Sequence, residues 1–341
     1  ELDQNNIPNK SWQGRHLVST RGCGVVMAPV GQVATNDRPV YHDLDVERPE
    51  LYFSDQIGGY AIVKTRVVET PCGTTTGEYT GTAGVELGGF FRRAAFALAF
   101  LDYNVVGSGA IDGDSQMLWV RSVSARVEKL APFLSYDTDP YPVVVEGTVK
   151  WVVDAYTSTD AFPYAQRIGD VQLTSSSGIS RDSNYIRNSV KAVVDAYTGE
   201  VTFYVVDPHD PITLAWQQAF PGLFTSRDQM PAELAEHMRY PEDLFRVQTE
   251  MYSKYQLPAE AFFQRNGAWS VAQAPSVNRL DTSTPTIGSD TTDDNAAAAF
   301  ATESGVQRFV PYYTMFRSEV GSADEFVILR PFVPFSTNDQ R

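Results

Sequence analysis

The chain has 341 residues, of which 43% are hydrophobic, so it can bury a core as one large domain or two ordinary ones. Its formal net charge of -15 argues against general binding to nucleic acid or to anionic lipid, because both depend on clustered Lys and Arg. No apolar run approaches the roughly 20 residues that a membrane-spanning helix needs. Since the sequence starts at Glu1 without an initiator Met and stops abruptly at Arg341, we expect it to be part of a longer protein.

The first part of the chain is predicted to combine short strands with two helices. Strands are expected over three stretches, at residues 15–33, 51–53 and 60–68. A turn at Gly58-Gly59 is expected to join the last two. Apolar residues recur at helical spacing over about 86–103, which predicts the first helix. A second helix is expected to start after Asp114, as its N-cap, and to end before Pro132.

A nine-residue phrase occurs twice in the middle of the chain, at Val149–Thr157 and at Val190–Thr198, and the copies differ only at the third position, Trp151 against Ala192. Each copy is an apolar, β-branched run that reaches an Asp, at Asp154 and at Asp195, where we expect the strand to enter a turn. Residues 142–145 are expected to form a hairpin with the first copy, and residues 201–206 with the second. We therefore interpret both Asp residues as turn formers rather than as catalytic groups.

The last part is predicted to add helices and one more hairpin. Helices are expected at residues 212–220 and after three prolines, Pro231, Pro241 and Pro258. The hairpin is expected to pair residues 309–317 with residues 326–335. Between them, residues 273–305 are rich in Ser, Thr, Asp and Ala, which predicts a flexible insertion.

These elements do not alternate as strict βαβ units. The pattern favours an α+β fold in which antiparallel β-hairpins form a mixed sheet with packed helices. We expect an N-terminal α+β part at residues 1–135 and a hairpin and helix part at residues 136–341. One continuous domain is the alternative.

Few residues indicate chemistry. None of the four His belongs to a close metal-binding pair, and His16, beside Arg15, is the one that we single out as a binding candidate. Asp137 and Asp139 are further binding candidates, because their oxygens could serve Ca²⁺, as could those of the acidic run at 207–210. The alternative is turn formation, since both clusters lie against Pro. No metal site is predicted, and no cofactor apart from the Ca²⁺ hypothesis.

Catalytic motifs are not recognisable. There is no Gly-x-Ser-x-Gly elbow, and the glycines at 81–89 lack the Gly-Lys-Ser/Thr of a phosphate-binding loop. Whether the protein is an enzyme is therefore open, and the sequence favours a non-enzymatic role. Cys23 and Cys72 fit either one disulfide or two free thiols, and an extracytoplasmic compartment would favour the disulfide.

Long phrases of the chain resemble one family, uncharacterised protein family 0182. They include Arg48–Phe53, Arg92–Leu98, Lys129–Leu134, Asp139–Pro142, both copies of the repeated phrase and Arg239–Phe245. The resemblance implies a multi-pass membrane protein, found in actinobacteria, in which membrane helices precede a large soluble region. It implies membrane attachment through helices absent from this chain and exposure outside the cytoplasm. It supplies no function and no catalytic residues.

From this resemblance and the missing catalytic motifs we expect a binding or assembly role at the cell envelope. The partners would be envelope proteins or glycans, not nucleic acid. Two alternatives are a cell-envelope hydrolase and a regulatory domain of a membrane transporter. The hydrolase would need acidic groups with shifted pKa values in a pocket.

Overall fold

In the computed structural model of the protein, the described residues are 7–29, 32–34, 38–44, 46–70, 78–169, 171, 173, 177–264, 267–274, 308–317 and 324–334. They form two compact units. The first unit comprises Glu1–Leu134, Pro140–Ala155 and Ser189–Met238, and the second comprises Ser135–Asp139, Tyr156–Asn188 and Arg239–Arg341. The expected boundary at residue 135 stays a prediction, because the chain passes several times between these units.

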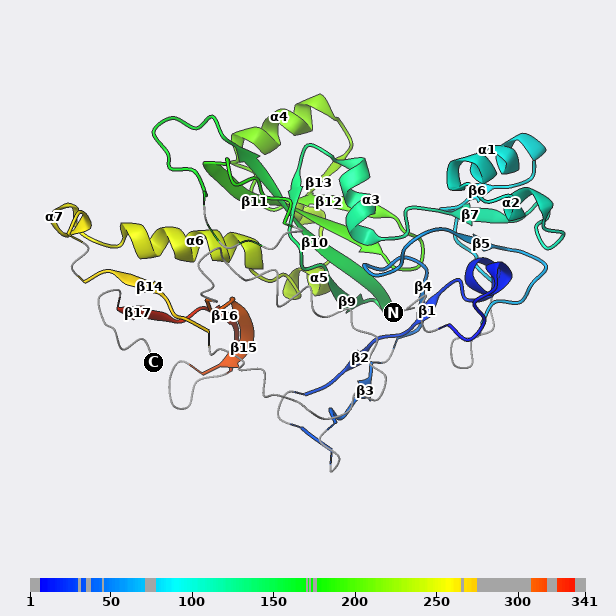
Figure 1. The fold of residues 1–341 in the computed structure, drawn as a ribbon, viewed down its shortest axis with the longest axis horizontal. Coiled ribbons are helices and arrows are strands. Elements are labelled where there is room, and N and C mark those ends of the chain that lie inside the picture. The colour runs from blue at the N-terminus through cyan, green and yellow to red at the C-terminus, as the bar shows by residue number, and fades with distance from the viewer. Residues whose placement is uncertain are drawn as a thin grey trace, which may run out of the picture. The chain divides into compact units, whose positions relative to one another are not determined.

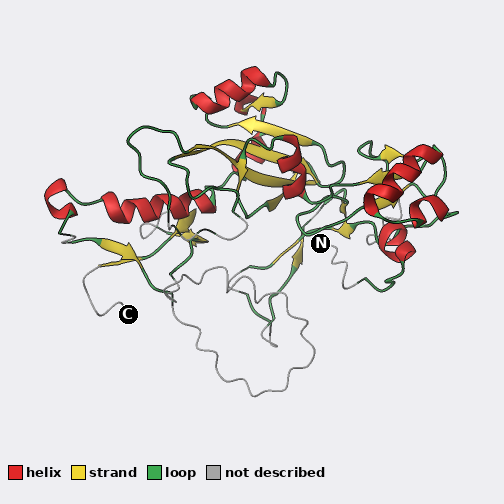
Figure 2. Ribbon diagram, turned by 45° about the horizontal axis from the view of Figure 1, so that its top comes forward, coloured by secondary structure: helices red, strands yellow, loops and turns green. Residues whose placement is uncertain are grey.

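Helices and strands are both present in each unit, and the strand pairs are mostly antiparallel (Figure 2). The predicted α+β class is therefore confirmed. Among the described residues, no helix combines the length and the apolar character needed to cross a membrane. The predicted insertion at 273–305 lies outside the described residues apart from its first two positions.

The largest sheet has the strand order β13-β12-β11-β10-β8, with β9 also paired to β10 (Figure 1). The strands are β8 (Ser135–Tyr136), β9 (Tyr141–Val145), β10 (Thr148–Thr159), β11 (Tyr185–Asp195), β12 (Val201–Val205) and β13 (Phe224–Ser226). β9 pairs antiparallel with β10, and β11 with β12, so both predicted hairpins are confirmed. β12 and β13 run parallel. Glu146 and Gly147 both have positive φ, as a two-residue hairpin turn requires.

The core of the first unit lies against this sheet. Helix α5 (Ala232–Glu236) packs on β9. One buried cluster consists of Tyr141, Val143, Val145, Val152, Val193, Tyr204, Met230 and Leu234. Alternate residues of β9 and single residues of β10, β11 and β12 supply it, as expected when one face of a sheet is covered. Helix α4 (Pro211–Ala219) begins at Asp210, whose side chain accepts the Thr213 N–H.

The two copies of the repeated phrase lie on neighbouring strands and are joined by crossed ion pairs. The Ala196 N–H donates to the Val149 carbonyl at 3.0 Å, which places the start of one copy beside the end of the other. As a result, Lys191 of the second copy pairs with Asp154 of the first, and Lys150 pairs with Asp195. The Lys191 and Asp154 side chains are only 5% and 3% exposed.

The expected turn at Asp154 is therefore wrong, whereas Asp195 does form one. Because Lys191 neutralises the Asp154 carboxylate inside the sheet, β10 continues for five residues beyond it to Thr159. Asp195 accepts the backbone N–H groups of Tyr197 and Thr198 at 2.9 and 2.7 Å, which closes the hairpin turn.

In its described residues, the N-terminal segment of the first unit is a set of short strands with three α-helices. The strands are β1 (Gly22–Cys23), β2 (Val26–Met27), β3 (His42–Asp43), β4 (Glu50–Leu51), β5 (Ala61–Val63), β6 (Val85–Glu86) and β7 (Gln116–Leu118). They pair as β1-β4, β2-β3 and β5-β7-β6. The chain turns at Gly58-Gly59 as expected, and Gly59 has a positive φ of 70°. The two strands that the turn joins do not pair with each other, since β4 pairs with β1 and β5 with β7.

The helices of this segment are α1 (Phe90–Phe100), α2 (Asn104–Gly107) and α3 (Val123–Leu130), besides a π-helical turn at Gly14–Val18. The predicted start of the second helix after Asp114 is wrong, because the residues that follow Asp114 form β7. The Ser122 hydroxyl, which accepts the Ala125 N–H, caps α3 instead. Cys23 is disulfide-bonded, whereas Cys72 lies outside the described residues, so their pairing stays a prediction.

The second unit is built around helix α6 (Glu242–Tyr255), followed by α7 (Ala259–Phe262). Strand β14 (Trp269–Val271) packs on α6 and pairs antiparallel with β17 (Phe332–Pro334). The predicted last hairpin is confirmed as β15 (Tyr312–Phe316) with β16 (Glu325–Leu329). A buried cluster joins the inner face of α6 to neighbouring segments of the unit, through Tyr156, Ile168, Val171, Leu173, Ile179, Leu244 and Val247.

The buried Lys191–Asp154 pair predicts a specific stability profile. We expect Asp154→Ala to lower the free energy of unfolding by about 3–5 kcal/mol, because it removes the carboxylate that pairs with a buried ammonium group. Replacing both partners, in Asp154→Leu with Lys191→Met, is expected to recover most of that loss. Urea unfolding followed by circular dichroism measures both. A double variant no more stable than Asp154→Ala contradicts the importance of this pair.

Candidate functional site

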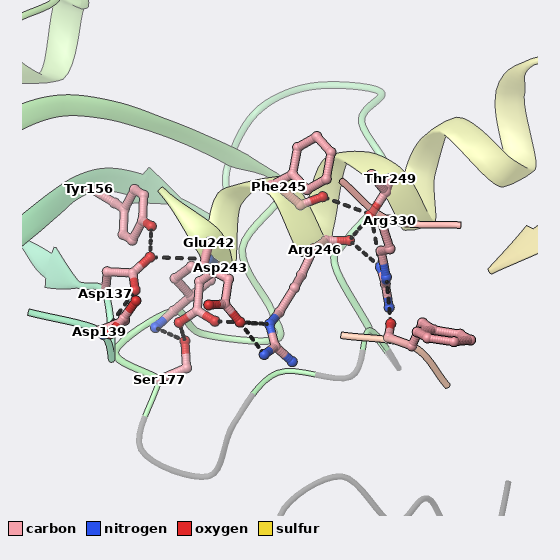
Figure 3. A network of polar contacts seen from close by, with 12 residues as sticks. Asp137, Asp139, Tyr156, Ser177, Glu242, Asp243, Phe245, Arg246, Thr249 and Arg330 are labelled. Carbon is pink, nitrogen blue, oxygen red and sulfur yellow. Dashed lines mark hydrogen bonds and ion pairs between the residues drawn. The ribbon is translucent and has the colours of Figure 1, made fainter. Parts of the chain in front are cut away.

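Asp137 caps helix α6 from outside the helix. The residue before α6, Pro241, offers no side-chain acceptor, so the first N–H groups of the helix need another partner. The Asp137 carboxylate accepts the Asp243 N–H at 3.1 Å and also accepts the Tyr156 hydroxyl (Figure 3). Its other oxygen accepts the Asp139 N–H at 3.1 Å. A buried negative charge therefore lies at the positive end of the α6 dipole.

A second carboxylate, Asp243, lies beside Asp137 within the first turn of α6. It is 1% exposed and accepts the Ser177 hydroxyl at 2.8 Å (Figure 3). Arg246 lies 3.8 Å from it and donates to Glu242 at 3.1 Å. Burial first, and then the charge of Asp137, raises the pKa of Asp243 to about 6. Asp243 therefore holds a proton more readily than an isolated carboxylate does.

Arg330 fixes the middle of α6. Its guanidinium donates to the Arg246 carbonyl at 3.2 Å, to the Thr249 hydroxyl at 2.8 Å and to the Phe309 carbonyl at 3.0 Å. Burial lowers the pKa of Arg330 to about 10, so the group stays charged at neutral pH. Because one planar group contacts the helix at two points and a separate segment at a third, it ties α6 to Phe309.

Asp139 belongs to a smaller cluster beside this network. Arg239 donates to the Asp139 carbonyl at 2.9 Å and to its carboxylate at 2.5 Å. The same guanidinium lies 4.5 Å from the centre of the Tyr313 ring, at a cation–π distance. The Tyr313 hydroxyl donates to the Tyr240 carbonyl at 2.6 Å. These contacts connect the segment before α6 with strand β15.

The four binding candidates from the sequence do not form one site. Asp137 and Asp139 belong to the α6 network of the second unit, whereas Arg15 and His16 belong to the first. The His16 ring stacks on Tyr60 at 4.1 Å, and its Nδ1 lies 2.9 Å from the Tyr60 carbonyl. Burial lowers the pKa of His16, so it is neutral at pH 7. Arg15 is exposed. A binding role for any of the four stays a prediction.

The acidic clusters have structural partners. The oxygens of Asp137 accept three protein donors, and Asp210 accepts Ser189, the Thr213 N–H and the Thr213 hydroxyl. Over the described ranges, no three His, Cys, Asp or Glu residues are grouped as metal ligands would be. These contacts explain why the acidic residues lie where they do. Binding of Ca²⁺ by these residues stays a prediction.

The C-terminal half of α6 lines a pocket of about 370 Å³ in the second unit. The lining residues are Gln166, Glu250, Ser253, Lys254, Tyr255, Leu257, Phe262, Phe263, Ala268, Trp269, Ser270 and Arg308. Four of the lining residues are aromatic. Tyr255 stacks on Phe262 at 5.7 Å, and Phe262 meets Phe263 edge to face at 5.6 Å. The Tyr255 hydroxyl donates to Gln166, which joins the helix to the opposite wall.

Several polar groups that line the pocket have no side-chain partner among the described residues. The Ser270 hydroxyl is buried, and the structure shows no hydrogen bond to it from any described residue. Within the described part of the chain, Glu250, Lys254 and Arg308 form no ion pair, although Arg308 donates one N–H to the Val271 carbonyl at 2.5 Å. Apolar walls with a few polar groups of this kind are typical of small-molecule sites.

The network and the pocket occupy opposite ends of one helix. Glu242 to Thr249 make the polar contacts, and Glu250 to Tyr255 line the pocket. Asp243 has a raised pKa, as a general acid would, but it is enclosed and does not line the pocket. The network therefore serves to position α6, and the pocket is the candidate site for binding.

Fold and site define an α+β protein with an aromatic pocket at the end of a helix that is capped from a distant segment. The chain belongs to the Uncharacterised protein family (UPF0182), whose pattern it matches over residues 1–340. A UPF0182 protein of Pelotomaculum thermopropionicum is 36% identical over 98% of this chain, and one of Streptomyces coelicolor is 38% identical over 88%. No solved structure matches the chain.

The relatives come from a wider range of organisms than expected. A UPF0182 protein of the archaeon Methanospirillum hungatei is 34% identical over 98% of this chain, so the restriction to actinobacteria is wrong. The chain spans about a third of the length of these relatives: 34%, 32% and 36% of the three proteins named.

Neither the pocket nor the role of Arg330 is predicted by the sequence. Their residues come from separated stretches, 166, 250–270 and 308–330, which meet only in the folded unit. A weak signal existed for the network: Glu242 and Arg246 are four residues apart at a predicted helix start, a spacing that favours an ion pair.

The raised pKa of Asp243 predicts a pH effect on stability. The ordinary value is 3.8 and the folded value about 6, so the stabilisation from protonating Asp243 is fully present below about pH 4. It is lost as pH rises through 6. Lowering the pH from 7 to 4 should therefore stabilise the wild type relative to Asp243→Asn, by about 1 kcal/mol per pH unit at most.

Urea unfolding of both proteins at pH 4, 5, 6 and 7 measures this difference. Asp182→Asn is the matched control, because Asp182 is an exposed carboxylate of the same unit. A stability difference between wild type and Asp243→Asn that stays constant over this range contradicts the assignment.

Proposed function

We propose that this chain is a ligand-binding domain at the outer side of a cell membrane and that its second unit binds envelope glycan. The observation that carries the proposal is the aromatic pocket at the end of α6. It combines exposed rings with polar groups that have no ion-pair partner among the described residues. The extracytoplasmic location is an expectation from the family resemblance.

The chemistry of the pocket suits a sugar. A sugar ring presents C–H groups on its faces and hydroxyl groups at its edge. Trp269 and Tyr255 offer flat apolar surfaces, being 45% and 54% exposed. Gln166, Glu250 and Ser270 offer donors and acceptors at the rim and in the wall.

Binding is favoured over hydrolysis by the distribution of carboxylates. Glycoside hydrolysis uses two carboxyl groups that flank the scissile bond. The pocket lining contains one, Glu250, and the Asp137–Asp243 pair lies outside that lining. A domain that regulates a transporter is the remaining alternative, and it would need a docking surface for the membrane part rather than this pocket.

The disulfide at Cys23 supports the proposed location. Disulfides persist mainly in oxidising compartments outside the cytoplasm. This agrees with the membrane attachment that the family resemblance implies. Since the chain spans about a third of its relatives, the activity of the whole protein is part of the proposal.

Binding of the purified chain to an array of bacterial envelope glycans tests the proposal. We expect wild type to bind at least one glycan and Trp269→Ala to lose about tenfold or more in affinity, since stacking on an aromatic ring is lost. Trp119→Ala is the matched control, because Trp119 is 42% exposed and belongs to the first unit. Equal loss in both variants, or no binding by wild type, overturns the proposal.

A further inference from the structure

We infer that the pocket at the end of α6 takes an acidic sugar, one that carries a carboxylate or a phosphate group. The inference rests on the proposed glycan-binding function and specifies its ligand. Lys254 and Arg308 are the groups that would bind the acid, while the aromatic walls would bind the sugar ring.

The charge of the pocket differs from that of the chain. The chain has 42 acidic and 27 basic residues, so an average surface should be acidic. The pocket lining instead contains two basic residues, Lys254 and Arg308, and one acidic residue, Glu250. A cavity with a positive excess inside an acidic protein favours anionic ligands, because the ligand is attracted there and repelled elsewhere.

Glu250 does not cancel this excess, because it is one carboxylate against two cations, Lys254 and Arg308. Buried Arg330 lies close enough to Glu250 for the carboxylate to favour its charged form, so it adds a further positive charge nearby. Lys254 and Arg308 form no ion pair with any described residue, so both charges remain for a ligand.

Arg308 is held in place for such a role. One of its N–H groups donates to the Val271 carbonyl at 2.5 Å, which anchors the guanidinium to strand β14. The guanidinium has further N–H groups that can bind a carboxylate or phosphate with two parallel hydrogen bonds. Lys254 is exposed on the last turn of α6 and can add a flexible point charge.

A simple inorganic anion would leave most of this pocket unused. The volume of about 370 Å³ is lined by four aromatic residues, Tyr255, Phe262, Phe263 and Trp269. Ser270 also lines this pocket, but its hydroxyl is buried, so the ligand is selected by the aromatic walls and the two cations. A sugar ring covers the apolar walls, whereas a bare ion does not.

Titration of the purified chain with matched sugars tests the inference. The carboxylate probe is trigalacturonic acid, with its trimethyl ester as the neutral partner of the same size. The phosphate probe is glucose 6-phosphate, with glucose as its neutral partner. Calorimetry at physiological salt should show at least one acidic probe binding about tenfold or more tighter than its neutral partner, as expected for a charge-assisted hydrogen bond.

Variants then assign the preference to its residues. Lys254→Gln and Arg308→Gln should each reduce the ratio of acidic to neutral affinity about threefold or more, while the neutral sugar binds as before. Lys254 is exposed, so Lys254→Gln remains informative even if Arg308→Gln fails to fold. Arg317→Gln is the control, because Arg317 is 56% exposed, pairs with Asp324 and does not line the pocket.

The outcomes separate this inference from the function on which it rests. Equal binding of acidic and neutral sugars overturns the inference and leaves glycan binding intact. A preference that Lys254→Gln and Arg308→Gln do not change also overturns it, because the acid is then recognised elsewhere. If sodium phosphate binds as tightly as glucose 6-phosphate, the inference is also overturned, because the pocket then recognises the anion and not the sugar. If no probe binds, both the inference and the proposed function fail.

Discussion

The second unit depends on one contact, in which the Asp137 carboxylate accepts the backbone N–H of Asp243 at 3.1 Å. Helix α6 starts after a proline and has no capping side chain of its own, so a residue more than a hundred positions earlier provides the cap. The same carboxylate accepts the Tyr156 hydroxyl, and Tyr156 belongs to the buried cluster against which α6 packs. The position and register of α6 therefore depend on the buried Asp137 carboxylate, which cannot move without losing several hydrogen-bond partners.

The rest of the unit follows from where this contact places α6. Arg330 binds the helix one turn further on, and β14 packs along it, so the side chains of its last turns meet Trp269 and Ser270. Placing the buried Asp243 carboxylate beside Asp137 is unfavourable, and the raised pKa of Asp243 reflects this. The arginines of the network compensate most of the negative charge. A rigid helix with one anchored end and one end in a pocket is suited to ligand binding, because the pocket is formed before the ligand arrives.

The predictability of the structure from its sequence differs between local and distant contacts. Both central hairpins were predicted, because β-branched runs and residues such as Gly147 and Gly199 determine strands and turns locally. Asp154 was misread as a turn former, since its partner Lys191 lies on another strand and neutralises it there. The start of the second helix was misplaced because Asp114 and Ser122 are both good caps, and only tertiary pairing of β7 with β5 and β6 selects Ser122. The sequence marks Asp137 as a binding candidate, but two of its three donors, the Tyr156 hydroxyl and the Asp243 N–H, come from distant segments.

Hydrogen–deuterium exchange on the wild type and on Asp137→Ala tests most directly whether this contact holds the helix that carries the pocket. Amide groups of α6 and of β14 should exchange roughly tenfold faster in the variant, because the cap and the Tyr156 contact are both lost. Amide groups of β11 and β12 within the first unit should exchange at unchanged rates and so show that the fold is intact. Unchanged protection of α6 in Asp137→Ala would contradict the account, since the helix would then be held by packing alone.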